Sequence, residues 1–199
     1  MTQEQSFIGA ARREQIIKAA IEVLNEIGYV KVSLAKIAKQ AKISTGLISY
    51  HFSDKEDVLN QTLMYVVTTQ IHYINEKVEA EEGPYQKLLA FIQASLTYQT
   101  EYYKYNVAML EIIFNGRTAD NIPYYKLAGD DEDALYLQLE EILVQGQTEG
   151  IFSSAIQPKT AAILINGAIS ESLLLQNDSF DMASYQEELV VLVTRMVKE

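Results

Sequence analysis

The residues best suited to chemistry form a run of lysines and hydroxyl groups near the N-terminus. Between Lys31 and Tyr50 the chain has four lysines and no Asp or Glu, whereas the whole protein has a formal net charge of −11. Lysines bind phosphate through charge, and hydroxyl groups contact phosphate oxygens or base edges. These residue types in one stretch indicate contacts with nucleic acid, although a solvated lysine face on a helical hairpin is the alternative.

Two short helices joined by a tight turn are expected to carry these residues. Apolar side chains recur at i, i+3, i+4 and i+7 over residues 34–41, which is the pattern of one helix face. Ser44 suits the N-cap of the second helix, where Ile48 and Phe52 lie four apart and point into the core. Ser53 and Glu56, three apart, predict a capping box that opens a longer helix.

A longer motif surrounds this helix-turn-helix. It comprises Gly28-Tyr29, Val32-Ser33, Ile37-Ala38, Ala41, Ile43-Ser44, the run from Gly46 to Phe52, and Asp54-Lys55-Glu56. With these residues in register, the stretch from about Arg12 to about Leu63 resembles the DNA-binding domain of TetR-family transcriptional regulators. The rest of the chain resembles the family in length, helical pattern and order of elements.

The resemblance implies which side chains meet DNA. It implies backbone contacts at Ser33, Lys36, Tyr50, His51 and Lys55. The side chains that would face base edges come from the second helix of the motif and are Thr45, Gly46, Leu47 and Ser49. Ser44, the expected N-cap of this helix, is a further expected DNA contact.

The second helix departs from the common family pattern in one respect. Ser49 stands where a second aromatic residue is usual, and the helix has no Arg, Lys, Asn or Gln. Bidentate pairs with guanine or adenine are therefore not available from it. We expect readout by hydroxyl groups, by Leu47 against thymine methyl groups, and by DNA shape. For Arg12 and Arg13, at the start of the first helix, phosphate contact and a solvated helix start remain equal alternatives.

Composition excludes several other classes of protein. The 199 residues contain no cysteine, so neither disulfides nor thiolate chemistry is expected. The two histidines, His51 and His72, lack metal-ligand spacing, and no nucleotide-binding or nucleophile motif is present. We therefore expect no enzyme activity, metal or cofactor. The N-terminus lacks a signal pattern and no apolar run is long enough to span a membrane, so a cytoplasmic protein is expected.

Charge is divided unevenly along the chain. Residues 1–60 contain eight basic and seven acidic residues, whereas the remainder contains eight basic and twenty acidic residues. An acidic body repels DNA and confines any DNA contact to the N-terminal end. We predict a helix-turn-helix DNA-binding domain over residues 1–54 and a ligand-binding and dimerisation domain over residues 55–199.

The pattern stays helical throughout, which predicts an all-α fold of three helices followed by six. Residues 1–9 are expected to be frayed and the first helix to end at Gly28. The first helix is expected over residues 10–27, and those after the helix-turn-helix are expected over residues 55–78, 85–100, 102–114, 130–149, 158–176 and 181–197. Asp130, Asp131, Glu132 and Asp133 would form an acidic first turn in one of them.

The last two helices, 158–176 and 181–197, are apolar around more of their circumference than a surface helix requires. The resemblance implies that they pair with their copies in a homodimer. Simple burial within one subunit is the alternative. Dimerisation is favoured because two half-sites give a selectivity that a single helix-turn-helix lacks.

The body is rich in aromatic residues, and the resemblance implies a ligand cavity there. The candidate ligand contacts are Phe91, Tyr98, Tyr102, Tyr105, Met109, Phe114 and Tyr136. Aromatic rings beside Glu101, Glu111 and Glu140 would suit a lipophilic cation. The simpler interpretation is that each of these aromatic residues is ordinary core.

These features favour a ligand-responsive transcriptional repressor that binds operator DNA as a dimer and is released by a small lipophilic molecule. The alternative is an all-helical protein–protein interaction module whose helix-turn-helix binds no DNA. Salt-dependent DNA binding separates the two hypotheses.

Overall fold

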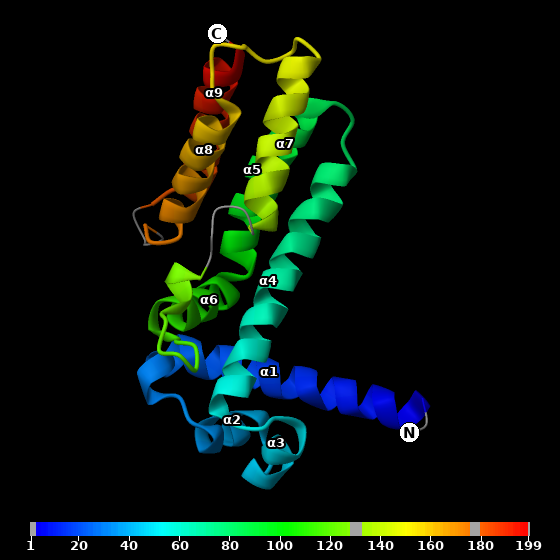
Figure 1. Ribbon diagram of the computed structural model, residues 1–199, viewed down its shortest axis with the longest axis vertical. Coiled ribbons are helices and arrows are strands. Elements are labelled where there is room, and N and C mark those ends of the chain that lie inside the picture. The colour runs from blue at the N-terminus through cyan, green and yellow to red at the C-terminus, as the bar shows by residue number, and fades with distance from the viewer. Residues whose placement is uncertain (1–2, 128–132, 176–179, 199) are drawn as a thin grey trace. The chain divides into compact units, whose positions relative to one another are not determined.

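The computed structural model describes residues 3–127, 133–175 and 180–198, and within these ranges the chain is all-α (Figure 1). This confirms the predicted fold class. The elements, in chain order, are α1 (Gln3–Lys31), α2 (Leu34–Ala41), α3 (Thr45–His51), α4 (Lys55–Glu79), α5 (Pro84–Glu101), α6 (Tyr103–Asn115), the 3-10 helix η1 (Tyr124–Lys126), α7 (Ala134–Thr148), α8 (Pro158–Ser172) and α9 (Met182–Lys198).

The chain divides into two compact units. The N-terminal unit comprises Met1–Thr69 and Lys104–Leu127, and the C-terminal unit comprises Gln70–Tyr103 and Ala128–Glu199. Helix α6 joins the N-terminal unit because Ala108 and Ile112 are fully buried in the same core as the residues of α1. The domain boundary between residues 54 and 55 stays a prediction, and compact packing adds the segment from α6 to η1 to the N-terminal helices.

Helix α1 begins earlier than the sequence indicated. Residues 3–9 form its first turns, so the expectation of a frayed segment is wrong for them. The predicted stop at Gly28 is confirmed, because this residue has a φ of 72° and interrupts the helical backbone. Glycine adopts this left-handed conformation without the steric cost that a Cβ atom imposes.

The start of α4 differs from the predicted capping box by one residue. Asp54 Oδ1 accepts the backbone N–H of Asp57 at 2.8 Å, and Asp57 Oδ2 accepts the backbone N–H of Ser53 at 2.8 Å. The Ser53 N–H is the main cause that lowers the pKa of Asp57. Both registers place an acid three residues after a capping residue, and the tertiary contact decides between them: Glu56 instead accepts a hydrogen bond from Tyr29.

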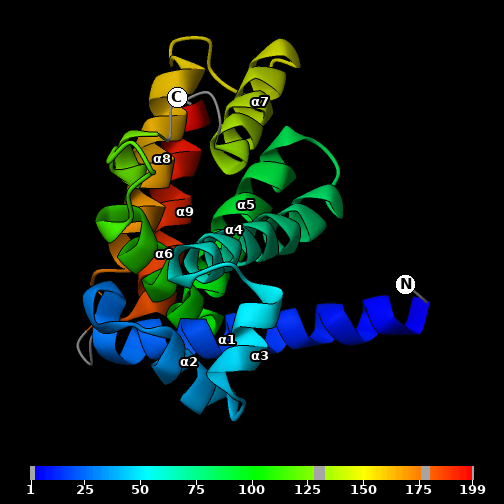
Figure 2. The same ribbon diagram turned by 60° about the horizontal axis from the view of Figure 1, so that its bottom comes forward.

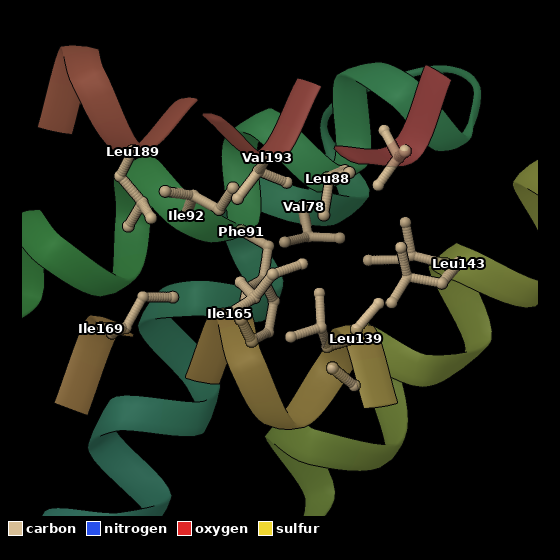
Figure 3. Close-up of a cluster of buried hydrophobic side chains, with 14 of the residues drawn as sticks. Val78, Leu88, Phe91, Ile92, Leu139, Leu143, Ile165, Ile169, Leu189 and Val193 are labelled. Carbon is tan, nitrogen blue, oxygen red and sulfur yellow. The ribbon is translucent and has the colours of Figure 1, made fainter. Parts of the chain in front are cut away.

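The C-terminal unit is built around one apolar core. Phe91 of α5 lies in its middle, between Leu139 and Leu143 of α7, Ile165 of α8 and Val193 of α9 (Figure 3). Helix α7 begins at Ala134, with Asp133 as its N-cap, whereas Asp130, Asp131 and Glu132 of the predicted acidic turn lie outside the described residues. Helix α8 ends at Ser172, and Gln176, its predicted end, also lies outside them.

Candidate functional site

Helix α3 separates a buried face from an exposed face. Ile48 and Phe52 have exposed fractions of 0% and 3% and anchor the helix in the N-terminal core, as predicted. Thr45, Gly46 and Ser49 are exposed on the other side. Because its polar side is exposed, this face of α3 is open to a partner. Figure 2 shows α3 beside α1 and α2.

Serine side chains cap both helices of the motif. Ser44 Oγ accepts the backbone N–H of Leu47 at 3.2 Å, and Ser33 Oγ accepts the backbone N–H of Lys36 at 3.4 Å. The predicted cap at Ser44 is therefore confirmed. A hydroxyl group that accepts one hydrogen bond still has its own hydrogen to donate. Both serines can therefore hold the local backbone and contact an acceptor such as phosphate at the same time.

Lysines supply the positive charge around this motif. Lys31, Lys36, Lys39 and Lys42 are all exposed, and Lys36 Nζ donates to the backbone oxygen of Lys31 at 2.7 Å. Lys55 is different, because its Nζ lies 4.9 Å from the centre of the Tyr29 ring and is half-buried. Lys55 is therefore held over an aromatic face at the start of α4.

Tyr50 and His51 form an aromatic pair at the end of α3. Tyr50 is 82% exposed, and the two rings meet edge to face with their centres 5.0 Å apart. Burial, with the nearby cations Arg13 and Arg12, lowers the pKa of His51. The imidazole is therefore neutral at pH 7 and offers one N–H donor rather than a charge.

Two residues have positions that the sequence did not reveal. Arg13 lies with its guanidinium 5.1 Å from the centre of the Phe52 ring and donates to Gln61 Oε1 at 2.7 Å, so it is held against α3 and α4. Tyr29 belongs to the family motif, but the motif alone does not indicate its role. An aromatic residue directly after a helix-ending glycine was the available clue, since it must pack where the chain turns.

The seven candidate ligand residues are divided between the two compact units. Tyr105, Met109 and Phe114 belong to the N-terminal unit, and Phe114 is 63% exposed. Phe91, Tyr98, Tyr102 and Tyr136 belong to the C-terminal unit. Their role as ligand contacts stays a prediction.

Within the C-terminal unit, three tyrosines form a continuous aromatic cluster. The rings of Tyr98 and Tyr102 are stacked with centres 4.6 Å apart, and Tyr73 packs against both. Tyr73 Oη donates to Glu101 Oε2 at 3.3 Å. Of the three glutamates expected beside the aromatic residues, Glu101 is therefore placed as expected, whereas Glu111 belongs to the N-terminal unit and accepts the backbone N–H of Tyr29 at 2.8 Å.

The described ranges contain neither a metal site nor a membrane span. No group of three His, Cys, Asp or Glu side chains there is arranged to hold a metal ion. Across the same residues, no helix combines the length and the apolar character that crossing a bilayer requires.

Comparison with known families gives two matches that together span most of the chain. Residues 16–62 match the model described as bacterial regulatory proteins of the tetR family. Residues 83–199 match the C-terminal region of MAATS-type transcriptional repressors.

Among curated proteins, the matched segments are short. The chain is 42% identical over 77 residues to the HTH-type transcriptional regulator HbdR of Aromatoleum sp. (strain CIB), covering 39% of this chain and 34% of that protein. It is 43% identical over 56 residues to the HTH-type transcriptional regulator BetI of Yersinia pestis (strain Pestoides F), covering 28% of each. The matches thus span about a third of these relatives or less.

Solved structures share the fold over nearly the whole chain. The fatty acid degradation regulator FadR from Bacillus halodurans has a TM-score of 0.77 at 21% identity, covering 92% of this chain and 94% of its own. The regulator FadR from Bacillus subtilis, solved in complex with stearoyl-CoA, has a TM-score of 0.77 at 23% identity, covering 92% and 98%.

Proposed function

Because this chain belongs to the TetR family of bacterial transcriptional regulators, we propose that it binds operator DNA as a homodimer and is released by a small lipophilic molecule. The α2–α3 pair binds the major groove, and the C-terminal unit binds the effector. The protein acts in the cytoplasm as a repressor and has no catalytic role.

The observation that carries the proposal is the exposed surface of the motif. Four exposed lysines lie on the segment that leads into α3, serines cap α2 and α3, and no acidic residue lies between Lys31 and Tyr50. Lysines on the segment that precedes a recognition helix bind phosphates, whereas the net charge of −11 makes the rest of the chain repel them. DNA binding through this surface follows from that contrast.

Base recognition falls to a small set of exposed groups on α3. Thr45 and Ser49 offer hydroxyl groups, Leu47 offers a half-buried methyl surface, and Gly46 allows close approach. Without a bidentate side chain, sequence preference is shared between these groups and DNA shape. A substitution Ser49→Asn adds a bidentate partner for adenine and shifts the selected sequence toward adenine opposite position 49.

The dimer forms through α8 and α9. Four large apolar side chains on these helices are 49–61% exposed: Ile163, Leu164, Val191 and Leu192. A groove between the helices is lined by Leu164, Leu192 and Met196, among others. A contiguous apolar surface of this kind is typical of an interface between subunits.

The effector is a molecule with a long or broad apolar part. The neighbour FadR from Bacillus subtilis was solved with stearoyl-CoA, whose acyl chain has this character. In this chain the C-terminal core is apolar, and it is adjoined by the tyrosine cluster of Tyr73 on α4, Tyr98 on α5 and Tyr102 directly after α5. Two buried acceptors, Asn75 Oδ1 and Gln138 Oε1, lack a hydrogen-bond donor among the described residues, which favours an effector that also carries donor groups.

The test is fluorescence anisotropy on DNA selected from a random pool, repeated over a salt series. We expect tight binding that weakens steeply with salt, and a further loss for Lys36→Ala and Tyr50→Ala. The control is Lys159→Ala, an exposed lysine of α8 outside the motif. Selection of no sequence above background at low salt contradicts the proposal and favours an interaction module.

A further inference from the structure

We infer that Tyr29 is a positioning residue that holds the Lys55 ammonium ready for a DNA phosphate, and that Glu111 of α6 fixes Tyr29 in place. The inference rests on the proposed function, because the phosphate belongs to the operator DNA. Every residue involved lies in the N-terminal unit.

The first step is the fixed backbone of Tyr29. Its N–H donates to Glu111 Oε2 at 2.8 Å, and Asn115 Nδ2 donates to the backbone oxygen of Glu111 at 2.9 Å. A Cβ atom on Gly28 would lie 3.2 Å from the same carboxylate oxygen, at a residue whose φ is already 72°. Glycine at this position therefore allows both the turn and the close approach of Glu111.

The second step is the orientation of the Tyr29 ring. Its hydroxyl donates to Glu56 Oε2 at 2.8 Å, so the ring is held at both its backbone and its distal end. Burial, and then the hydrogen bond to Glu56, raise the pKa of Tyr29, so the hydroxyl stays a donor at every physiological pH. A ring held at two points presents one constant face.

That face carries Lys55. The Lys55 Nζ lies 4.9 Å from the ring centre, within the range of a cation–π contact, and 3.9 Å from Glu56 Oε1. A free lysine side chain loses rotamer entropy when it binds a phosphate. A lysine already restricted over a ring loses less, so Tyr29 increases DNA affinity without touching DNA.

Tyr29 also packs against the N-terminal core, so the experiment must separate positioning from packing. We use a double-mutant cycle of Tyr29→Leu with Lys55→Met, measured by anisotropy on the selected operator across a salt series. Positioning predicts that Tyr29→Leu weakens binding by about three- to fivefold per site, the size of an exposed cation–π contact, and has no effect once Lys55 is Met. A loss of the same size in both backgrounds shows that Tyr29 only packs, and overturns the inference.

Salt dependence gives a second readout that a packing role would not change. Lys55→Met removes a phosphate partner and lowers the slope of log affinity against log salt by about 0.9 per phosphate. Tyr29→Phe keeps the ring and the core volume but loses the hydrogen bond to Glu56, so we expect an affinity between those of the wild type and Tyr29→Leu, with the salt slope of the wild type. If Tyr29→Phe lowers the DNA affinity as much as Tyr29→Leu does, the contact between the ring and Lys55 does not contribute to DNA binding.

A measurement without DNA separates this inference from the proposed function. In the wild-type protein, Lys55 Nζ lies over the Tyr29 ring, so we expect the NMR signals of the adjacent ε-methylene protons to be shifted upfield. Lys39, which is exposed, serves as the internal control and keeps ordinary shifts. An unshifted Lys55 overturns the inference even if the protein binds DNA, whereas a shifted Lys55 in a protein that binds no DNA overturns only the proposed function.

Discussion

The helix-turn-helix and the C-terminal core use aromatic side chains in opposite ways. In the N-terminal unit, Tyr50 is 82% exposed and Tyr29 supports a lysine. In the C-terminal unit, Phe91 and Tyr98 are each only 1% exposed and pack among aliphatic side chains and other rings. The same residue types therefore lie at the surface or support a surface lysine in one region and pack inside the core in the other.

The two regions also differ in how far apart in the sequence their contacting residues lie. The hydrogen bonds that cap the helices at Ser33 and Ser44 join residues that are three positions apart in the sequence. The buried contact between Gln99 Nε2 and the backbone oxygen of Ile169, at 2.8 Å, joins residues that are 70 positions apart. The helix caps of the N-terminal unit are therefore readable from short motifs, whereas the C-terminal core depends on helices distant in sequence.

The largest test of this contrast is Phe91→Ala against Phe114→Ala, two residues predicted as ligand contacts. Phe91 is 1% exposed, so its loss should lower the free energy of unfolding by about 3–5 kcal/mol. Phe114 is 63% exposed, and its loss should change that free energy by less than about 0.5 kcal/mol. Urea denaturation measures both, and equal effects would show that the burial contrast is wrong.

The second test concerns the apolar surface of α8 and α9. Leu192→Glu should give a monomer, because Leu192 is 61% exposed and a charge there opposes contact with a second copy. Loss of the second half-site should weaken operator binding on the order of a hundredfold. Sedimentation velocity and anisotropy measure the two effects. The matched control is Val144→Glu on α7, because Val144 is 47% exposed and lies outside α8 and α9. If the Leu192→Glu variant is still a dimer, the proposed interface is wrong.

The third test is smaller and concerns the N-terminal unit. Glu111→Ala removes the acceptor of the Tyr29 N–H, which should lower the free energy of unfolding by about 1–2 kcal/mol. Glu26→Ala, on the exposed side of α1, should change it by less than about 0.5 kcal/mol. Thermal and urea unfolding give the comparison, and two similar values would mean that the Glu111 contact contributes little.

The smallest expected effect is the change of stability and DNA affinity with pH that titration of His51 causes. Because its folded pKa is lowered, the unfolded chain holds more protons as the pH falls below 6.5, so stability decreases in that window. A nearby phosphate favours the protonated form, so DNA binding takes up a proton and affinity rises as the pH falls. One proton permits at most about a tenfold rise per pH unit.

Anisotropy between pH 7.5 and 5.5 at constant ionic strength measures this dependence. His51→Gln keeps a donor but cannot be charged, so its affinity should vary less with pH than that of the wild type. Identical pH profiles for both proteins would exclude a phosphate contact at His51.

The features that the sequence predicted correctly share one property: each depends on interactions between residues that are close in the sequence. The stop at Gly28, the cap at Ser44 and the inward direction of Ile48 and Phe52 each depend on a few adjacent residues. The capping box at Ser53 and Glu56 was wrong because two registers fit the same local pattern. The choice was made by the hydroxyl of Tyr29, which is 27 positions from Glu56.

By itself, the sequence determined the all-α fold, the helix-turn-helix with its positive face, and the family. These features follow from hydrophobic periodicity, helix caps and charge, which act between near neighbours. Only the tertiary structure decided that α6 packs with the N-terminal helices, that Glu111 binds the backbone of Tyr29, and that Lys55 lies over an aromatic ring. Such contacts depend on which helices meet and at which turn, and packing between distant segments determines that choice.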